Sequence, residues 1–198
     1  MPDIDPDRKS KIIHIKSDFS RVEEAVDTVV TNIKDTPLDF IIHNAGLVDE
    51  TFEDVEIAQA RDVLSINLMV PVFLTKKLIP NIKNRHHKKV VFIGSVSGVD
   101  NNYCPAVFYA ASRAGARGVT QQLRTLYKDD QISFPLIEPG RMATDMDYDD
   151  SVEAAIEQHN GERIPVQDLV KTMEWLLSLS SVSCPKEIVL TDMKFNII

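Results

Sequence analysis

Apolar residues along this chain gather in short continuous runs instead of alternating with polar residues. Five runs are of strand length and rich in β-branched side chains: residues 11–16, 38–43, 89–94, 131–138 and 187–191. A run that is apolar at successive positions is typical of a strand buried on both faces, as in a parallel sheet. We therefore predict a parallel sheet that is covered by helices on both sides.

Longer segments between these runs show the apolar spacing of helices: residues 20–34, 55–83, 106–128, 152–158 and 166–178. The first segment opens with Ser20 and Glu23, the spacing of a capping box, which bonds the free N–H groups at a helix start. Strands that alternate with helices indicate an α/β fold. No internal repeat or linker interrupts the pattern, so we expect a single domain over residues 1–198.

The charge balance limits the classes of partner. The chain has 22 lysines and arginines against 30 aspartates and glutamates, a formal net charge of −8. This acidic balance argues against nucleic acid and against an anionic membrane as partners, and we interpret the basic residues 85–89 as a solvated turn. No uninterrupted apolar stretch approaches the ~20 residues of a membrane-spanning helix. Two cysteines without zinc-site or disulfide spacing, and no signal-peptide pattern, favour a cytoplasmic protein without a metal site.

Polar and turn-forming residues follow four of the apolar runs. They are Ser17 and Asp18, Asn44 to Gly46, Ser95 and Ser97, and Pro139 and Gly140 with Thr144. The carboxyl ends of parallel strands meet at one edge of a sheet, where ligands bind. Each group alone also suits an ordinary turn, but four in succession predict a ligand site. The acidic residues 145–150 are expected to form a solvated segment before the next helix, with a lid over a substrate as the alternative.

A second candidate feature lies at the start of the predicted helix 106–128. Tyr109 and Arg113 are four residues apart and therefore share one face of that helix. A cation beside a phenol favours the phenolate form. Together with a serine hydroxyl from a strand end, such a tyrosine suits proton transfer to or from a carbonyl or alcohol oxygen. A surface tyrosine and arginine at helical spacing are also common, so the pair carries weight only with the other motifs.

Taken in order, these motifs resemble the short-chain dehydrogenase/reductase family over nearly the whole chain. The residues that match family motifs are His43-Asn44-Ala45-Gly46, Asn67, the segment Gly94-Ser95-Val96-Ser97-Gly98, Tyr109 with Arg113, and Pro139-Gly140-Arg141-Met142-Ala143-Thr144-Asp145. Asp18-Phe19 also fits the aspartate and apolar residue that family members place against adenine. The resemblance implies a doubly wound, Rossmann-like parallel sheet.

The resemblance also implies a chemistry and a role for each matching residue. The reaction would be hydride transfer between NAD or NADP and a small carbonyl or alcohol substrate. Tyr109 would be the acid/base, Ser95 would hold the substrate oxygen, Asn67 would position a relay water, and Arg113 would complete the catalytic set. The cofactor-binding residues would be Asp18, Phe19, Asn44, Ala45, Gly46, Tyr109, Arg113, Pro139, Gly140, Met142 and Thr144.

Two departures from the family pattern concern the activity. Arg113 stands where the family has lysine, and an arginine, with a pKa above about 12, does not give up its proton, so we expect an impaired proton relay. The first of the chain's seven glycines is Gly46, so the family's opening strand–helix–strand–helix with its glycine-rich loop, about 40 to 50 residues, has no counterpart. Without these strands, residues 11–16 are expected to pair with 38–43, pair elsewhere, or fray.

Two functional hypotheses follow, with a third ranked last. The chain is an N-terminally truncated version, or a descendant, of an NAD(P)-dependent reductase, with Met1 an internal start, and cofactor binding is affected by the missing loop. Alternatively, it is a catalytically impaired scaffold that serves as an oligomerisation or interaction module. The resemblance implies a homodimer or homotetramer that pairs through the helices 55–83 and 106–128. A rearranged site for another small molecule is the third possibility.

Overall fold

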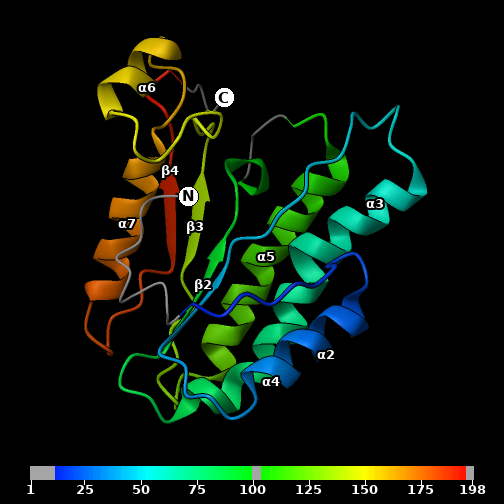
Figure 1. Ribbon diagram of the computed structural model, residues 1–198, viewed down its shortest axis with the longest axis vertical. Helices are drawn as coiled ribbons and strands as arrows, with labels where there is room; N and C mark the ends of the chain where they lie inside the picture. Colours follow the sequence, from blue (N-terminus) through cyan, green and yellow to red (C-terminus); the bar gives the residue numbers. More distant parts are fainter. Residues whose placement is uncertain (1–11, 100–103, 195–198) are drawn as a thin grey trace.

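The computed structural model describes residues 12–99 and 104–194 (Figure 1). Its four strands are β1 (Phe40–His43), β2 (Lys89–Ile93), β3 (Leu136–Pro139) and β4 (Glu187–Leu190). Its α-helices are α2 (Val22–Ile33), α3 (Ile57–Leu64), α4 (Val70–Lys83), α5 (Val107–Leu126), α6 (Val152–Gln158) and α7 (Val166–Ser178). The helical predictions 152–158 and 166–178 coincide with α6 and α7.

The sheet is parallel throughout and has the order β1-β2-β3-β4. Figure 1 shows α2, α4 and α5 on one side of the sheet and α7 on the other. The predicted α/β fold with a parallel sheet is therefore confirmed. Because the strands run in the same direction, their carboxyl ends lie along one edge, at the top of the sheet in Figure 1.

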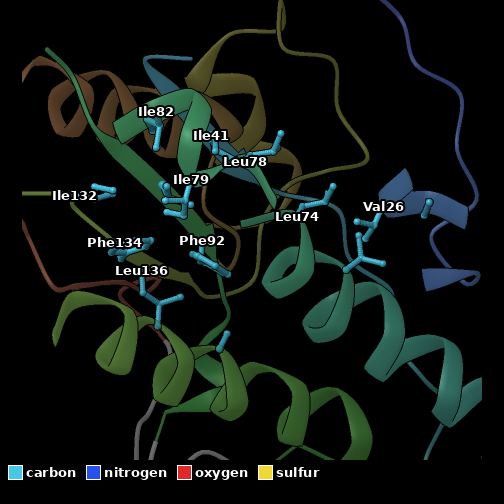
Figure 2. Close-up of a cluster of buried hydrophobic side chains, with 14 of the residues drawn as sticks. Val26, Ile41, Leu74, Leu78, Ile79, Ile82, Phe92, Ile132, Phe134 and Leu136 are labelled. Atoms are coloured by element: carbon cyan, nitrogen blue, oxygen red, sulfur yellow. The ribbon is translucent and has the colours of Figure 1, made fainter. Parts of the chain in front are cut away.

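Apolar side chains fill both interfaces between sheet and helices. In the larger cluster, Ile41 and Phe92 of the strands lie among Leu74 and Leu78 of α4 (Figure 2). The smaller cluster joins Val91 to side chains that include Leu176 of α7 on the opposite face. Successive residues of β2 are thus buried on opposite faces, which explains why its sequence is apolar without alternation.

The predicted strand over residues 11–16 is not part of the sheet. Residue 11 lies outside the described residues, and residues 12–16 form no strand, with Ile13 81% exposed. Of the three expectations for this run, an unpaired segment is the one that the structure shows. In the part of the chain that the structure describes, β1 therefore forms an edge of the sheet with one strand neighbour, β2.

The predicted capping box at Ser20 and Glu23 is wrong. The backbone N–H and the hydroxyl of Ser20 both donate to Asp18 Oδ1, at 3.0 and 2.8 Å. The serine thus closes a turn with Asp18, and α2 begins one residue later than a Ser20 cap would place it. A reciprocal capping pair stands instead at α3, where Glu56 N–H donates to Gln59 Oε1 at 2.9 Å.

The predicted helix 55–83 is one continuous helical run with a π-helical turn, Ser65–Met69, between α3 and α4. The run of 27 residues is long and apolar enough to cross a membrane, with a mean hydropathy of 1.4 in its most apolar window. Half of that window is buried inside the fold. Val63 and Val70 are both fully buried, so packing of a core helix accounts for the apolar composition.

Two further expectations need correction. The run 131–138 contributes strand pairing only from Leu136 onward, apart from a single bridge between Ser133 and Lys89. The solvated turn predicted for residues 85–89 does not include Lys89, which is fully buried at the start of β2 and donates from Nζ to the Leu179 carbonyl at 2.8 Å. Burial lowers the pKa of this ammonium group. The sequence around Lys89 does not distinguish it from a surface lysine, because the segment that covers its side chain, near Leu179, lies 90 positions away in the chain.

Candidate functional site

The rim at the carboxyl ends of the strands is built around Arg113 of α5. Its guanidinium donates from Nη1 to the Ile93 carbonyl at the end of β2, at 3.0 Å. A Cβ on Gly46, after β1, would collide with the same guanidinium. Arg113 is only 7% exposed, and its Nε has no hydrogen-bond partner among the described residues. One buried cation therefore connects α5 with the ends of two neighbouring strands.

Tyr109 lies one helical turn before Arg113 on the same face, as the spacing predicted. The guanidinium carbon of Arg113 is 4.9 Å from the centroid of the Tyr109 ring, a cation–π contact. The carboxylate of Asp49 accepts from the backbone N–H groups of Tyr109 and Phe108, at 3.0 and 3.2 Å. A carboxylate at this helix start stabilises the exposed N–H groups and fixes the position of Tyr109.

Asn67 holds the loop after β1 against α5. Its Nδ2 donates to the Leu47 carbonyl at 2.8 Å and to Ser112 Oγ at 3.0 Å, while Leu47 N–H donates to its Oδ1 at 2.8 Å. The residue lies in the π-helical turn and is 3% exposed. Such turns occur often at functional sites. The described contacts make the Asn67 side chain a positioning group, and the relay water stays a prediction.

Ser95 follows β2 and begins a short 3-10 turn, Val96–Gly98. Its hydroxyl accepts from Ser97 N–H at 3.1 Å, and the residue is 7% exposed. Gly98 brings this turn against α5, since a Cβ at position 98 would lie 2.6 Å from the Arg113 carbonyl carbon. The serine motif and the tyrosine helix are therefore in direct contact.

Residues predicted to hold the adenosine part of a cofactor line a groove beside β1. The groove has a volume of about 390 Å³, and Phe19, Asn44 and Ala45 line it together with apolar residues of α2 and α4. Asp18 is exposed in the turn just before Phe19, and hydrogen bonds from Ser20 lower the pKa of its carboxyl group. The structure thus brings residues 19, 44 and 45 together from two separate segments.

The remaining predicted residues follow β3. Gly140 N–H donates to the Leu190 carbonyl of β4 at 2.7 Å, and Pro139 is buried at the end of β3. Met142 pairs with Ile164 through an isolated bridge, and Thr144 is exposed beyond it. This segment therefore extends the rim to the far side of the sheet. The acidic residues 145–150 that come next are largely exposed, as expected of a solvated segment.

Sequence reasoning missed two residues of the rim and named a third, His43, only as part of a motif. Asp49 and Ser112 support Tyr109 and Asn67, and Ser112 Oγ also donates to the Tyr109 carbonyl at 2.7 Å. His43 is buried with its Nε2 2.9 Å from Thr75 Oγ1, and burial lowers the pKa of its imidazole to about 4, so it is neutral at neutral pH. The contact between Asp49 and Tyr109 joins residues 60 positions apart, which no local pattern indicates.

A family model described as short chain dehydrogenase matches residues 5–154. The chain belongs to the short-chain dehydrogenase family. The match includes the segments that carry Asn44, Ser95, Tyr109 and Gly140, so the resemblance stated from the motifs is confirmed. The members of this family are oxidoreductases that act on small molecules.

Two curated relatives show how much of the family's length is present. The chain is 32% identical over 126 residues to 2-dehydro-3-deoxy-D-gluconate 5-dehydrogenase of Formosa agariphila, covering 62% of this chain and 47% of that protein. It is 33% identical over 115 residues to dehydrogenase/reductase SDR family member 7B of Rattus norvegicus, covering 55% of this chain and 34% of that protein. The chain thus spans about half, or less, of the length of these short-chain dehydrogenase relatives.

Solved structures agree with the fold. The alcohol dehydrogenase from Thermococcus sibiricus, complexed with 5-hydroxy-NADP, superimposes with a TM-score of 0.74. The superposition covers 90% of this chain and 74% of that one, at 15% sequence identity. At this identity the likeness concerns the architecture, and it confirms a Rossmann-like parallel α/β fold for this short-chain dehydrogenase.

Proposed function

We propose that this short-chain dehydrogenase uses NAD or NADP to interconvert a small alcohol and its carbonyl compound. The observation that carries the proposal is the position of Arg113. Its guanidinium contacts the Tyr109 ring, donates a hydrogen bond to the Ile93 carbonyl and fills the space that a Cβ on Gly46 would need. These contacts place the tyrosine at the edge of the sheet where ligands of doubly wound folds bind. The Ser95 turn, packed on the same helix by Gly98, adds a hydroxyl group to this edge.

The chain's own residues then have distinct tasks. Tyr109 gives a proton to the oxygen of a carbonyl substrate, or takes one from an alcohol, and Ser95 holds that oxygen by a hydrogen bond. Asp49 and Asn67 keep the tyrosine helix and the loop after β1 in place through their hydrogen bonds. Arg113 supplies a fixed positive charge beside the phenol ring, and because a guanidinium keeps its proton, it does not pass one on.

The rim fits a nicotinamide cofactor in its shape and residue types. The groove lined by Phe19, Asn44 and Ala45 offers an apolar and amide surface of a size that suits a nucleoside. Gly140 and Thr144 follow β3, the strand next to β2, whose Ile93 carbonyl accepts from Arg113. A bound nicotinamide supplies or accepts the hydride of the reaction.

Titration of the purified chain with NADH and with NADPH, followed by nicotinamide fluorescence, tests the proposal. We expect saturable binding in the micromolar range with one of the two. Ala45→Trp fills the groove and is expected to weaken that binding at least tenfold, whereas Ala58→Trp, on the exposed surface of α3, leaves it unchanged. Absence of saturable binding by either cofactor up to about millimolar concentration, for a folded chain, contradicts the proposed activity.

A second candidate function, a module for self-association, is favoured by an apolar surface groove between α3 and α5. Its volume is about 460 Å³, and its lining includes Ile57, Leu64, Met69 and Phe108. Ile57 is 79% exposed, which is unusual for a large apolar side chain beside a groove. We propose a homodimer or homotetramer that buries this face, as the resemblance to the family implies.

Light scattering coupled to size-exclusion chromatography tests the self-association, and together with the cofactor titration it separates the two candidates. Ile57→Asp is expected to reduce the mass to that of a monomer, while Ile156→Asp, a comparable exposed position on α6, keeps the assembly. An unchanged mass for Ile57→Asp contradicts an interface at this groove. Self-association without cofactor binding favours the scaffold over the enzyme.

A further inference from the structure

A second pocket lies at the opposite edge of the sheet from Tyr109, at the amino ends of β3 and β4. It has a volume of about 320 Å³ and lies between the end of α5, the turn before β3 and the loop from α7 to β4. These segments lie at the lower end of the sheet in Figure 1. The dehydrogenase site uses none of the residues that line this pocket.

The lining of the pocket is cationic and contains no acidic side chain. Arg124, Lys128 and Lys186 contribute three positive charges, and three serines lie among them. This concentration of positive charge contrasts with the net charge of −8 of the whole chain. Positive charge gathered in a concave site raises the local concentration of anions.

The three cations are available to a ligand to different degrees. Arg124 is anchored, because its Nη1 donates to the carbonyls of Phe134 and Lys186 at 2.8 and 3.1 Å, but no described residue accepts from its Nη2. Neither Lys128 nor Lys186 forms an ion pair with a described residue. The charge of Arg124 helps to lower the pKa of the Glu187 carboxyl, which is itself held by Arg117 Nε at 2.7 Å. Lys128 and Lys186 therefore bring positive charge to the pocket that no ion pair with a described residue neutralises.

Ser133 gives an independent indication of a ligand. It lines the pocket, is 6% exposed, and its buried Oγ has no hydrogen-bond partner among the described residues. A buried hydroxyl without a partner costs ~1–3 kcal/mol, so such groups are rare and call for an explanation. An oxygen of a bound anion would accept its proton once the side chain turns toward the pocket, because the hydroxyl oxygen is closed to solvent in the described position.

We propose that this pocket binds a small phosphomonoester. Two lysines and an arginine can balance a phosphate dianion, and serine hydroxyls donate to its oxygens. Ile132 and Val182 add apolar surface beside the charges, and a volume of about 320 Å³ exceeds what a phosphate group alone would fill. The phosphate would be held by the cations and its organic part would contact these apolar side chains.

The test uses the 198-residue chain, ¹⁵N-labelled, titrated with phenyl phosphate, inorganic phosphate and benzyl alcohol. Phenyl phosphate should produce saturable amide shifts at Ser133, Ser183 and Lys186, inorganic phosphate should bind more weakly, and benzyl alcohol should not bind. Absence of saturable shifts with phenyl phosphate overturns the proposal. Equal affinity for inorganic and phenyl phosphate overturns the assignment to an ester, and shifts confined to Gly46 and Tyr109 overturn the location.

Variants locate the interaction. Lys128→Gln and Lys186→Gln are each expected to weaken binding of phenyl phosphate by roughly fivefold, the effect of removing one charge near a water-exposed anion. Lys76→Gln, an exposed lysine of α4, serves as the matched control and leaves the affinity unchanged. Ser133→Ala should weaken binding without lowering the melting temperature, because it removes a hydroxyl that has no partner in the protein. Unchanged affinity in the double variant Lys128→Gln/Lys186→Gln overturns the proposal.

Discussion

Arg113 of α5 occupies the space that a side chain at position 46 would need. A Cβ on Gly46 would collide with Nη2 of the guanidinium, while Nη1 of the same group bonds to the Ile93 carbonyl. The arginine, which stands where the resemblance to the family predicts a lysine, is therefore built into the rim, between the ends of β1 and β2. Its first role in this dehydrogenase is to join α5 to the sheet beside Tyr109.

This contact makes Gly46 sensitive to substitution. Gly46→Ala should displace the buried guanidinium and lower the free energy of unfolding by ~1–3 kcal/mol, the usual cost of overpacking. Gly118→Ala is the matched control: nothing lies within 4 Å of a Cβ there, and α5 should gain ~0.5–1 kcal/mol from the better helix former. Urea unfolding measures both. A Gly46→Ala protein as stable as the parent would mean that Arg113 moves aside freely.

The replacement Arg113→Lys should increase turnover once a working substrate is known. An ammonium group can release and regain a proton, which a guanidinium does not do. The Tyr109→Phe protein should bind cofactor with unchanged affinity but lose turnover, because it keeps the ring contact and lacks the hydroxyl. Steady-state rates with cofactor titrations distinguish the effects. An unchanged or lower rate for Arg113→Lys would contradict a relay that is limited by arginine.

Asn67 should matter for stability as much as for the site. Asn67→Ala removes bonds to the Leu47 backbone and to Ser112 inside a buried turn, and is expected to lower the free energy of unfolding by ~2–4 kcal/mol. Asn32→Ala is the control, since this exposed side chain bonds only to the Thr28 carbonyl of its own helix. Its effect should stay below ~0.5 kcal/mol. Comparable losses for the two variants would contradict the positioning role of Asn67.

The raised pKa of Glu138 predicts how the free energy of unfolding depends on pH. Burial raises the pKa of this fully buried carboxyl group from 4.5 to about 8, with the carboxylate of Glu187 adding to the shift and Arg117 opposing it. Between these values the folded protein holds a proton that the unfolded chain has released. The free energy of unfolding should therefore fall as pH rises from about 6.5 to 8, with a slope that approaches ~1.4 kcal/mol per pH unit. Below pH 6.5 the lowered pKa of His43 opposes this slope, because its imidazole takes up a proton on unfolding.

Denaturant unfolding across that pH range checks the sign. Glu138→Gln cannot ionise and should remove most of the slope and raise the stability at pH 8, while Glu174→Gln on the exposed face of α7 keeps the slope. A stability that rises between pH 6.5 and 8 would contradict a protonated Glu138. Such a slope has to be measured on the folded chain without cofactor, so that binding does not add its own pH dependence.

Much of the fold was visible in the sequence because strands and helices leave local patterns, although of β1, β2 and β4 only β2 is buried along most of its length. The apolar runs of β1, β2 and β4 and the helical spacing of α6 and α7 depend on residues a few positions apart. The capping prediction at Ser20 was wrong because two local partners lie within reach of its hydroxyl, an N–H group at the helix start and the Asp18 carboxylate. The structure shows the hydrogen bond to Asp18. Likewise, residues 12–16 have the composition of a strand but no described strand beside them.

The sequence by itself determined the family, the parallel α/β fold and the positions of Tyr109, Ser95 and Asn67 within their motifs. Only the tertiary structure decided that Arg113 joins two strand ends, that Asp49 caps the tyrosine helix, and that Lys89 and Glu138 are buried. Periodicity reports which face of an element is covered. It does not report which segment covers it, because contacts such as that of Asp49 with Tyr109 join residues 60 positions apart.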